Sequence, residues 1–126
     1  MMTIVKRWSA GVGAMDALTG LMLVFWPGWV LSLLGIGEVG PESWVWVRWI
    51  GVFVGSVGFS YGWVWRGARE AEAVWGWTAM VRAWVAVFVT VNVLSGRLET
   101  AWVGVAATDG VVGIVQFYGI RKRWCR

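Results

Sequence analysis

Four long apolar stretches, separated by short charged breaks, constrain the fold of this chain more than any other feature. These stretches cover approximately residues 8–27, 44–65, 75–94 and 98–120. Each is close to the roughly 20 residues with which an α-helix crosses a hydrocarbon core about 30 Å thick. A membrane β-barrel would need more segments, each of about ten residues with alternating polarity. The pattern predicts an all-α chain: one integral membrane domain over residues 1–126, a bundle of four transmembrane helices.

The composition agrees with this placement. Of the 126 residues, 59% are hydrophobic and 14% are charged, whereas ordinary soluble domains have about half and a quarter. The chain has no histidine and a single cysteine, Cys125, so an internal disulfide, histidine-based catalysis and a Cys/His metal site are excluded. We expect no catalytic residue, no metal and no cofactor, and the sequence favours a role other than that of an enzyme. Cys125 is interpreted as a bystander thiol, with acylation as the alternative.

Proline 27 interrupts the first stretch. Proline lacks an amide hydrogen and disfavours helix at the residue before it, so the first span is expected to end or kink near Trp26. The apolar residues of about 28–36 then predict a short segment that lies at the membrane interface. The start of the chain resembles a signal peptide, but Asp16 interrupts its apolar region and no small-residue cleavage site follows. A retained first helix is expected.

Basic residues predict the orientation. Eight of the eleven lie before the first span, between the second and third, or after the fourth: Lys6, Arg7, Arg66, Arg69, Arg121, Lys122, Arg123 and Arg126. The bias of Lys and Arg toward cytoplasmic loops sets the topology of membrane proteins. Both termini are therefore expected in the cytoplasm, in a multi-pass protein of the cell inner (cytoplasmic) membrane. Because orientation accounts for the positive charge, we expect no binding to nucleic acid.

The tryptophans predict two interfacial belts, since indole combines an apolar ring with a polar N–H. Only Trp84 falls near the middle of a span. The cytoplasmic belt would contain Trp8, Trp63, Trp65, Trp75, Trp77 and Trp124. The outer belt would contain Trp26, Trp29, Trp44, Trp46, Trp49 and Trp102.

Four charged residues lie inside the spans: Asp16, Arg48, Arg82 and Asp109. An ionised group near the bilayer centre costs roughly 2.5–3.5 kcal/mol on insertion scales, so each needs a partner or water. Counted from the cytoplasmic tryptophans, Asp16 and Arg82 lie about 10–12 Å deep and Asp109 about 16 Å deep. The sequence therefore predicts an intramembrane polar cluster of Asp16, Arg82 and Asp109. Arg48 and Asn92 have comparable depths near the outer side and are predicted as a second polar pair.

Each of these charges shares a helical face with small residues, on which neighbouring helices can approach closely. The four predicted faces are Ser9, Gly13, Asp16 and Gly20; Arg48, Gly51, Gly55, Gly58 and Gly62; Ala79, Arg82 and Ala86; and Ala106, Asp109, Gly113 and Gln116. A salt-bridge network that fixes the packing is the favoured interpretation of the cluster. A proton, ion or substrate site is the alternative, since carboxylates in a low dielectric can take up protons. Contact with a partner subunit or a quinone-like ligand stays open.

The second span begins with Val47-Arg48-Trp49-Ile50-Gly51, followed by Gly55 and Gly58, and the later spans carry Arg82, Asp109 and Gln116. This arrangement resembles small bacterial four-helix membrane proteins of the DoxX-like kind, which commonly carry an Arg and spaced glycines at this point. The resemblance implies an integral four-helix fold and, for some members, a role as accessory subunit of membrane redox complexes. It carries no catalytic residue over to this chain. Four-helix multidrug transporters have a similar length but centre on a Glu in the first span, where this chain has Asp16.

These observations favour an accessory or structural subunit of a membrane complex, or a membrane protein without an assignable activity. The alternative is a small transporter or channel that uses the Asp/Arg cluster, and a lipid-modifying membrane enzyme comes third. The expected partners are the lipid bilayer and either a membrane-protein partner or further copies of the chain, because four short helices cannot cover every glycine face.

Overall fold

The computed structural model describes residues 1–126 and is entirely helical. Its α-helices are α1 (Met2–Phe25), α2 (Pro27–Leu33), α3 (Trp44–Ser60), α4 (Ala68–Leu94) and α5 (Val103–Arg121). Three short 3-10 segments join them: η1 (Pro41–Ser43), η2 (Tyr61–Arg66) and η3 (Thr100–Trp102). The predicted all-α class is confirmed. Three helical segments, Met2–Phe25, Ala68–Leu94 and Thr100–Arg121, are long and apolar enough to cross a membrane.

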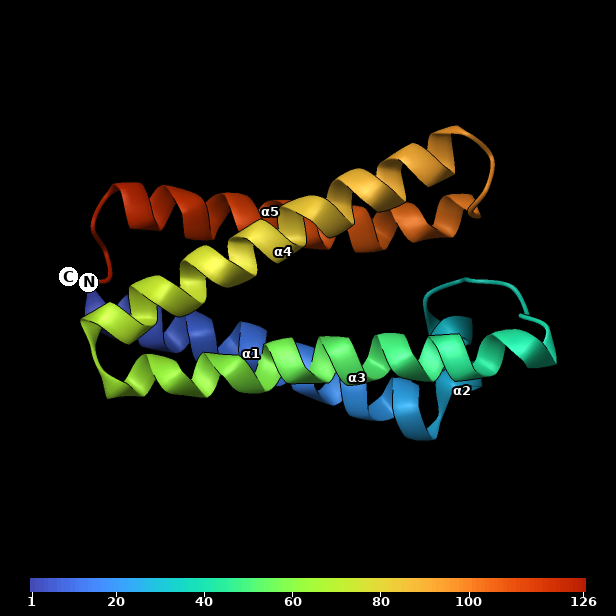
Figure 1. Ribbon diagram of the computed structural model, residues 1–126, viewed down its shortest axis with the longest axis horizontal. Helices are drawn as coiled ribbons and strands as arrows, with labels where there is room; N and C mark the ends of the chain where they lie inside the picture. Colours follow the sequence, from blue (N-terminus) through green and yellow to red (C-terminus); the bar gives the residue numbers. More distant parts are fainter.

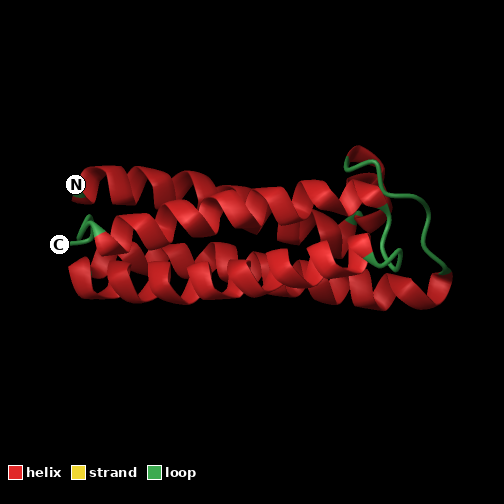
Figure 2. Cartoon of the chain, turned by 90° about the horizontal axis from the view of Figure 1, so that it is seen from above, coloured by secondary structure: helices red, strands yellow, loops and turns green.

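The long helices form two antiparallel pairs, α1 with α3 and α4 with α5 (Figure 1). Both termini lie at the same end of the elongated molecule, and α2 lies at the opposite end (Figures 1 and 2). The 3-10 segment η2 contacts both α1 and α4, so it joins the two pairs at the terminal end. Toward α2 the pairs diverge (Figure 1). This divergence determines which of the predicted polar contacts can form.

The helix break falls where proline predicts it. α1 ends at Phe25, and α2 begins at Pro27, a first helical position that has no need of an amide hydrogen. The short α2 then buries two side chains in the apolar cluster that closes this end of the molecule. That cluster consists of Leu23, Val30, Leu31, Ile36 and Val47. The loops at this end are tied together by the Gly37 amide, which donates a hydrogen bond to Glu99 Oε2 at 3.0 Å.

Glycines bring α1 and α3 into backbone contact. A Cβ atom at Gly51 would lie 2.8 Å from the carbonyl oxygen of Gly20, and one at Gly58 would lie 2.7 Å from that of Gly13. Both distances are shorter than real Cβ contacts allow, so only glycine permits this helix separation. The small-residue face predicted for the second span ends earlier than expected, at Gly58 on α3. Gly62 is exposed, and Tyr61 is buried instead.

Trp75 departs from the predicted cytoplasmic belt. Its side chain is completely buried, and its indole Nε1 donates a hydrogen bond to Ser9 Oγ at 2.8 Å. It belongs to the larger apolar cluster at the terminal end, with Val5, Val12, Tyr61, Val64, Ala71, Val112 and Cys125. Trp75 takes this position because it lies on the same face of α4 as Arg82, seven residues or two turns away, and that face points toward α1.

We expect the alanine substitution at Gly20 to destabilise the protein, because its Cβ would overlap the backbone of Gly55. Overpacking of this kind costs about 1–3 kcal/mol. The matched control is Gly11→Ala on the same helix, where a Cβ meets no atom within 4 Å. Because alanine favours helix more than glycine does, this variant should be more stable by about 1 kcal/mol. Thermal unfolding in mild detergent, followed by circular dichroism, measures both. Equal stability of the two variants would contradict the close α1–α3 contact.

Candidate functional site: a buried polar network

Arg82 lies at the centre of a polar network between the two helix pairs. Its Nη1 donates to Asp109 Oδ1 on α5 at 2.5 Å, and its Nη2 donates to Asp16 Oδ2 on α1. The side chains of Arg82, Asp16 and Asp109 are 4%, 10% and 19% exposed. The structure thus brings together the three residues that depth and helical phase place near one another.

Small residues around Arg82 make this geometry accessible. On α5, Gly113 lies against α4: a Cβ there would stand 3.5 Å from the Ala79 carbonyl oxygen and from Arg82 Cβ. Asp109 is four residues before Gly113 and therefore shares its helical face. The close helix contact at Gly113 carries Asp109 to within hydrogen-bonding distance of Arg82.

The network continues through Tyr61, a residue that the sequence analysis did not single out. Tyr61 Oη accepts from Gln116 Nε2 at 2.8 Å and lies 3.4 Å from Arg82 Nε and 3.5 Å from Nη2. Gln116 Nε2 also donates to Thr78 Oγ1 at 3.1 Å, and Thr78 donates to the Val74 carbonyl. The signal for Tyr61 was its position three residues after Gly58, on the face that contacts α1 and α4. Gln116 was on the predicted polar face, but its partners were not foreseen.

Two buried polar atoms have no hydrogen-bond partner, Gln116 Oε1 and Trp8 Nε1. Gln116 is completely buried, and both of its amide hydrogens are directed to hydroxyl oxygens. Its carbonyl oxygen is therefore an acceptor without a donor, inside the network that surrounds Arg82. Buried acceptors are seldom left unsatisfied, so this atom calls for an explanation.

The predicted pair of Arg48 and Asn92 does not form. Arg48 is exposed, and Asn92 Nδ2 donates to the carbonyl oxygen of Phe88 in its own helix at 2.8 Å. The reason is the divergence of the helix pairs toward α2, which leaves α3 and α4 with few direct contacts (Figure 1). Val47, rather than Arg48, is buried against the end of α1 and α2. Comparable depth did not imply contact.

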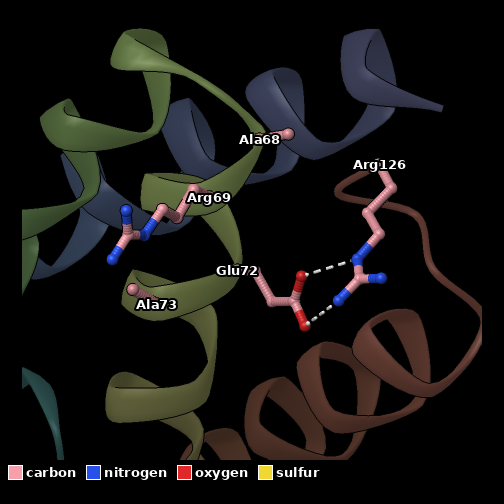
Figure 3. Close-up of a pocket in the computed structure, with 5 residues that line it drawn as sticks. All are labelled: Ala68, Arg69, Glu72, Ala73 and Arg126. Atoms are coloured by element: carbon pink, nitrogen blue, oxygen red, sulfur yellow. Dashed lines mark hydrogen bonds and ion pairs between the residues drawn. The ribbon is translucent and has the colours of Figure 1, made fainter.

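Asp16, Arg82 and Asp109 do not line either of two hollows on the surface, although Tyr61, which contacts Arg82, lines the second. A hollow of about 480 Å³ lies where α4 begins and the chain ends, lined by Ala68, Arg69, Glu72, Ala73 and Arg126 (Figure 3). A groove of about 280 Å³ runs over small residues of α1 and along α3 and η2. No group of three or more His, Cys, Asp or Glu side chains is arranged to hold a metal ion.

In the first hollow, Arg126 pairs with Glu72, at 3.0 Å between Nε and Oε2 and 3.4 Å between Nη2 and Oε1 (Figure 3). This ion pair is exposed, so it contributes little to stability. The neighbouring Cys125 is buried, with 1% of its surface exposed. Burial raises the pKa of its thiol, and the Glu72 carboxylate raises that pKa further. Both effects disfavour the reactive thiolate, so this thiol is a poor substrate for acylation while the protein is folded.

The arrangement acts as a clamp between the two helix pairs. One guanidinium on α4 holds a carboxylate from α1 and another from α5, while Tyr61 on η2 contacts it from a third direction. A guanidinium supplies five N–H donors in a fixed fork, which suits simultaneous binding of several oxygen acceptors. The cluster holds the α1–α3 pair against the α4–α5 pair where their backbones do not pack closely.

We expect Arg82→Gln to destabilise the protein by about 3–5 kcal/mol, because it leaves the buried Asp16 and the partly buried Asp109 without their partner. The double variant Asp16→Asn with Arg82→Gln should recover part of this loss, since one stranded acid is removed. Arg97→Gln is the control, because Arg97 is exposed and makes no ion pair. Unfolding temperatures in mild detergent provide the measurement. If Arg82→Gln and Arg97→Gln unfold at the same temperature, the clamp does not support the fold.

Comparisons with known proteins add no family to this description. No protein-family model, curated protein or solved structure matches the chain. The functional interpretation therefore depends on the geometry of the network and on the surface around it.

Proposed function

We propose that this chain is an integral membrane protein with four transmembrane helices and cytoplasmic termini, and that it serves as an accessory or structural subunit of a membrane complex. The observation that carries the proposal is the paired cluster at Arg82. It consists of three intramembrane charged side chains, from α1, α4 and α5, that bind one another. Charged side chains that pair with one another and so link three helices support a packing role.

Helix lengths support four spans. α1 and α4 measure about 36 Å and 40 Å, and α5 about 28 Å, at 1.5 Å per residue. α3 has 17 residues, but η2 continues it by six more. With a rise of about 2 Å per residue in a 3-10 helix, the two together extend roughly 37 Å, which exceeds a hydrocarbon core about 30 Å thick. We therefore propose α3 together with η2 as the fourth transmembrane span.

The surface supports a membrane environment and a partner within it. The accessible surface is 8040 Å², against about 6,700 Å² expected for a compact soluble monomer of this mass. Much of it comes from exposed large apolar side chains on every long helix, among them Leu18, Phe53, Trp84 and Phe117. Such an extensive apolar surface requires lipid or protein to cover it. The resemblance to DoxX-like proteins implies that this partner is a membrane redox complex.

The topology is tested with single cysteines at the two ends of the molecule, in a Cys125→Ser background. We expect a membrane-impermeant maleimide to label Glu38→Cys in intact cells, since this position lies in the loop between α2 and α3. Arg69→Cys at the other end should react only after the cells are permeabilised. Both native residues are exposed, so accessibility in the fold does not distinguish them. The opposite labelling pattern would reverse the orientation, and equal labelling of both sites would contradict it.

The accessory role is tested by affinity capture from native membranes in mild detergent, followed by identification of co-purified proteins. We expect a defined membrane-protein partner in a fixed ratio to the chain. An unrelated membrane protein with the same tag serves as the control for adventitious binding. Recovery of the chain alone would contradict the accessory role. If the purified chain alone also conducted ions or protons across liposomes, the transporter alternative would replace it.

A further inference from the structure

The polar cluster has an unbalanced charge. Arg82 is the only basic side chain in it, whereas Asp16 and Asp109 both bind that single guanidinium. Arg48, which would make the number of acids and bases within the spans equal, is exposed and belongs to the opposite end of the molecule. With both carboxylates ionised, the cluster therefore carries one uncompensated negative charge.

The network also has more hydrogen-bond acceptors than donors. Each carboxylate uses one oxygen on Arg82, and its second oxygen receives no hydrogen bond from the protein. Independently, the buried Gln116 Oε1 has no donor, although Gln116 joins the same network through Tyr61 Oη. Protonation of one carboxylate removes the uncompensated negative charge. Gln116 lies seven residues, about 10 Å along the helix axis, from Asp109, so its missing donor is a separate feature of the network.

We propose that the cluster is a binding site for one proton, held on the Asp109 carboxylate. The inference rests on the proposed membrane placement, since the exposed face of a spanning helix meets hydrocarbon rather than water. Asp109 is the more exposed of the two acids, so its ionised form has the greater contact with lipid, which favours the neutral acid. Asp16 remains ionised and paired with Arg82.

The groups that face Asp109 favour a proton over a metal cation. Arg82 on α4 contacts it directly, Asp16 approaches from α1 through the same guanidinium, and Tyr61 on η2 contributes a neutral hydroxyl. On its own helix the nearest polar member of the network is the uncharged Gln116, and α3 adds no charge at this level. A guanidinium in contact with both carboxylates repels a metal ion from the position between them. A proton on the free oxygen of Asp109 needs no such position.

Nuclear magnetic resonance tests this directly, because Asp16 and Asp109 are the only aspartates in the chain. The protein is made by cell-free synthesis with aspartate labelled with ¹³C at the side-chain carboxyl and placed in lipid nanodiscs. At neutral pH we expect two carboxyl signals, one at the protonated position and one at the ionised position. Asp16→Glu keeps an unlabelled acid beside Arg82, so its one remaining signal belongs to Asp109 and should be the protonated one. Asp109→Glu should leave only the ionised signal of Asp16. Glu70→Gln, outside the network, is the control and should leave both signals unchanged.

Two ionised signals at neutral pH, or an ionised Asp109 signal in Asp16→Glu, would overturn the proposal. Spectra that change with sodium concentration at constant pH would overturn it in favour of a bound cation. The wild-type spectrum decides whether one proton is bound even if a variant fails to fold. A chain that stays soluble without lipid would overturn the membrane placement and this inference together. Two ionised signals from protein embedded in nanodiscs would overturn the proton site alone.

Discussion

One guanidinium holds the two halves of this molecule together. Arg82 on α4 binds a carboxylate from α1 and one from α5, in a region where the two helix pairs do not approach backbone to backbone. Within each pair, glycine contacts allow close packing, as Gly20 and Gly55 show for α1 and α3. Between the pairs, polar side chains take over this function, and Trp75 bound to Ser9 adds a second link. Together with η2 and the apolar cluster around Trp75, which pack against both pairs, these contacts fix the position of each pair relative to the other.

A buried ion pair of this kind costs free energy, because its charged groups lose their contact with water. Buried ion pairs repay their desolvation only if geometry is good and the remaining polar atoms are satisfied. Here Tyr61 contacts the guanidinium, and Gln116 connects Tyr61 to Thr78 by hydrogen bonds. Gln116 Oε1 remains without a donor, and the charged cluster has two acids for one base. The structural clamp and the proton-binding site proposed above involve the same side chains: the first concerns packing and the second concerns charge.

Depth along a helix and helical phase were sufficient to predict the cluster residues, because a charge in a span must find a partner at its own level. The same reasoning was wrong for Arg48 and Asn92. Equal depth brings two groups together only where their helices are adjacent, and α3 and α4 diverge from each other at that end (Figure 1). Trp75 was likewise predicted at the membrane interface because it is a tryptophan near the end of a span, but its face of α4 points into the molecule. Tyr61 was missed because the predicted face was continued to Gly62, four residues after Gly58, whereas the structure buries Tyr61, three residues after Gly58.

The sequence by itself determined the helical class, the break at Pro27, the small-residue faces and the presence of charges that require partners. These features depend on local chemistry: the length of apolar runs, the missing amide of proline, the size of glycine and the cost of an ionised group in hydrocarbon. Only the tertiary structure decided that Arg82 serves two acids at once, that Tyr61 and Gln116 complete its surroundings, and that Arg48 stands apart. Those outcomes depend on which helices are neighbours, and pairing of helices is a property of the whole packing arrangement rather than of any one segment.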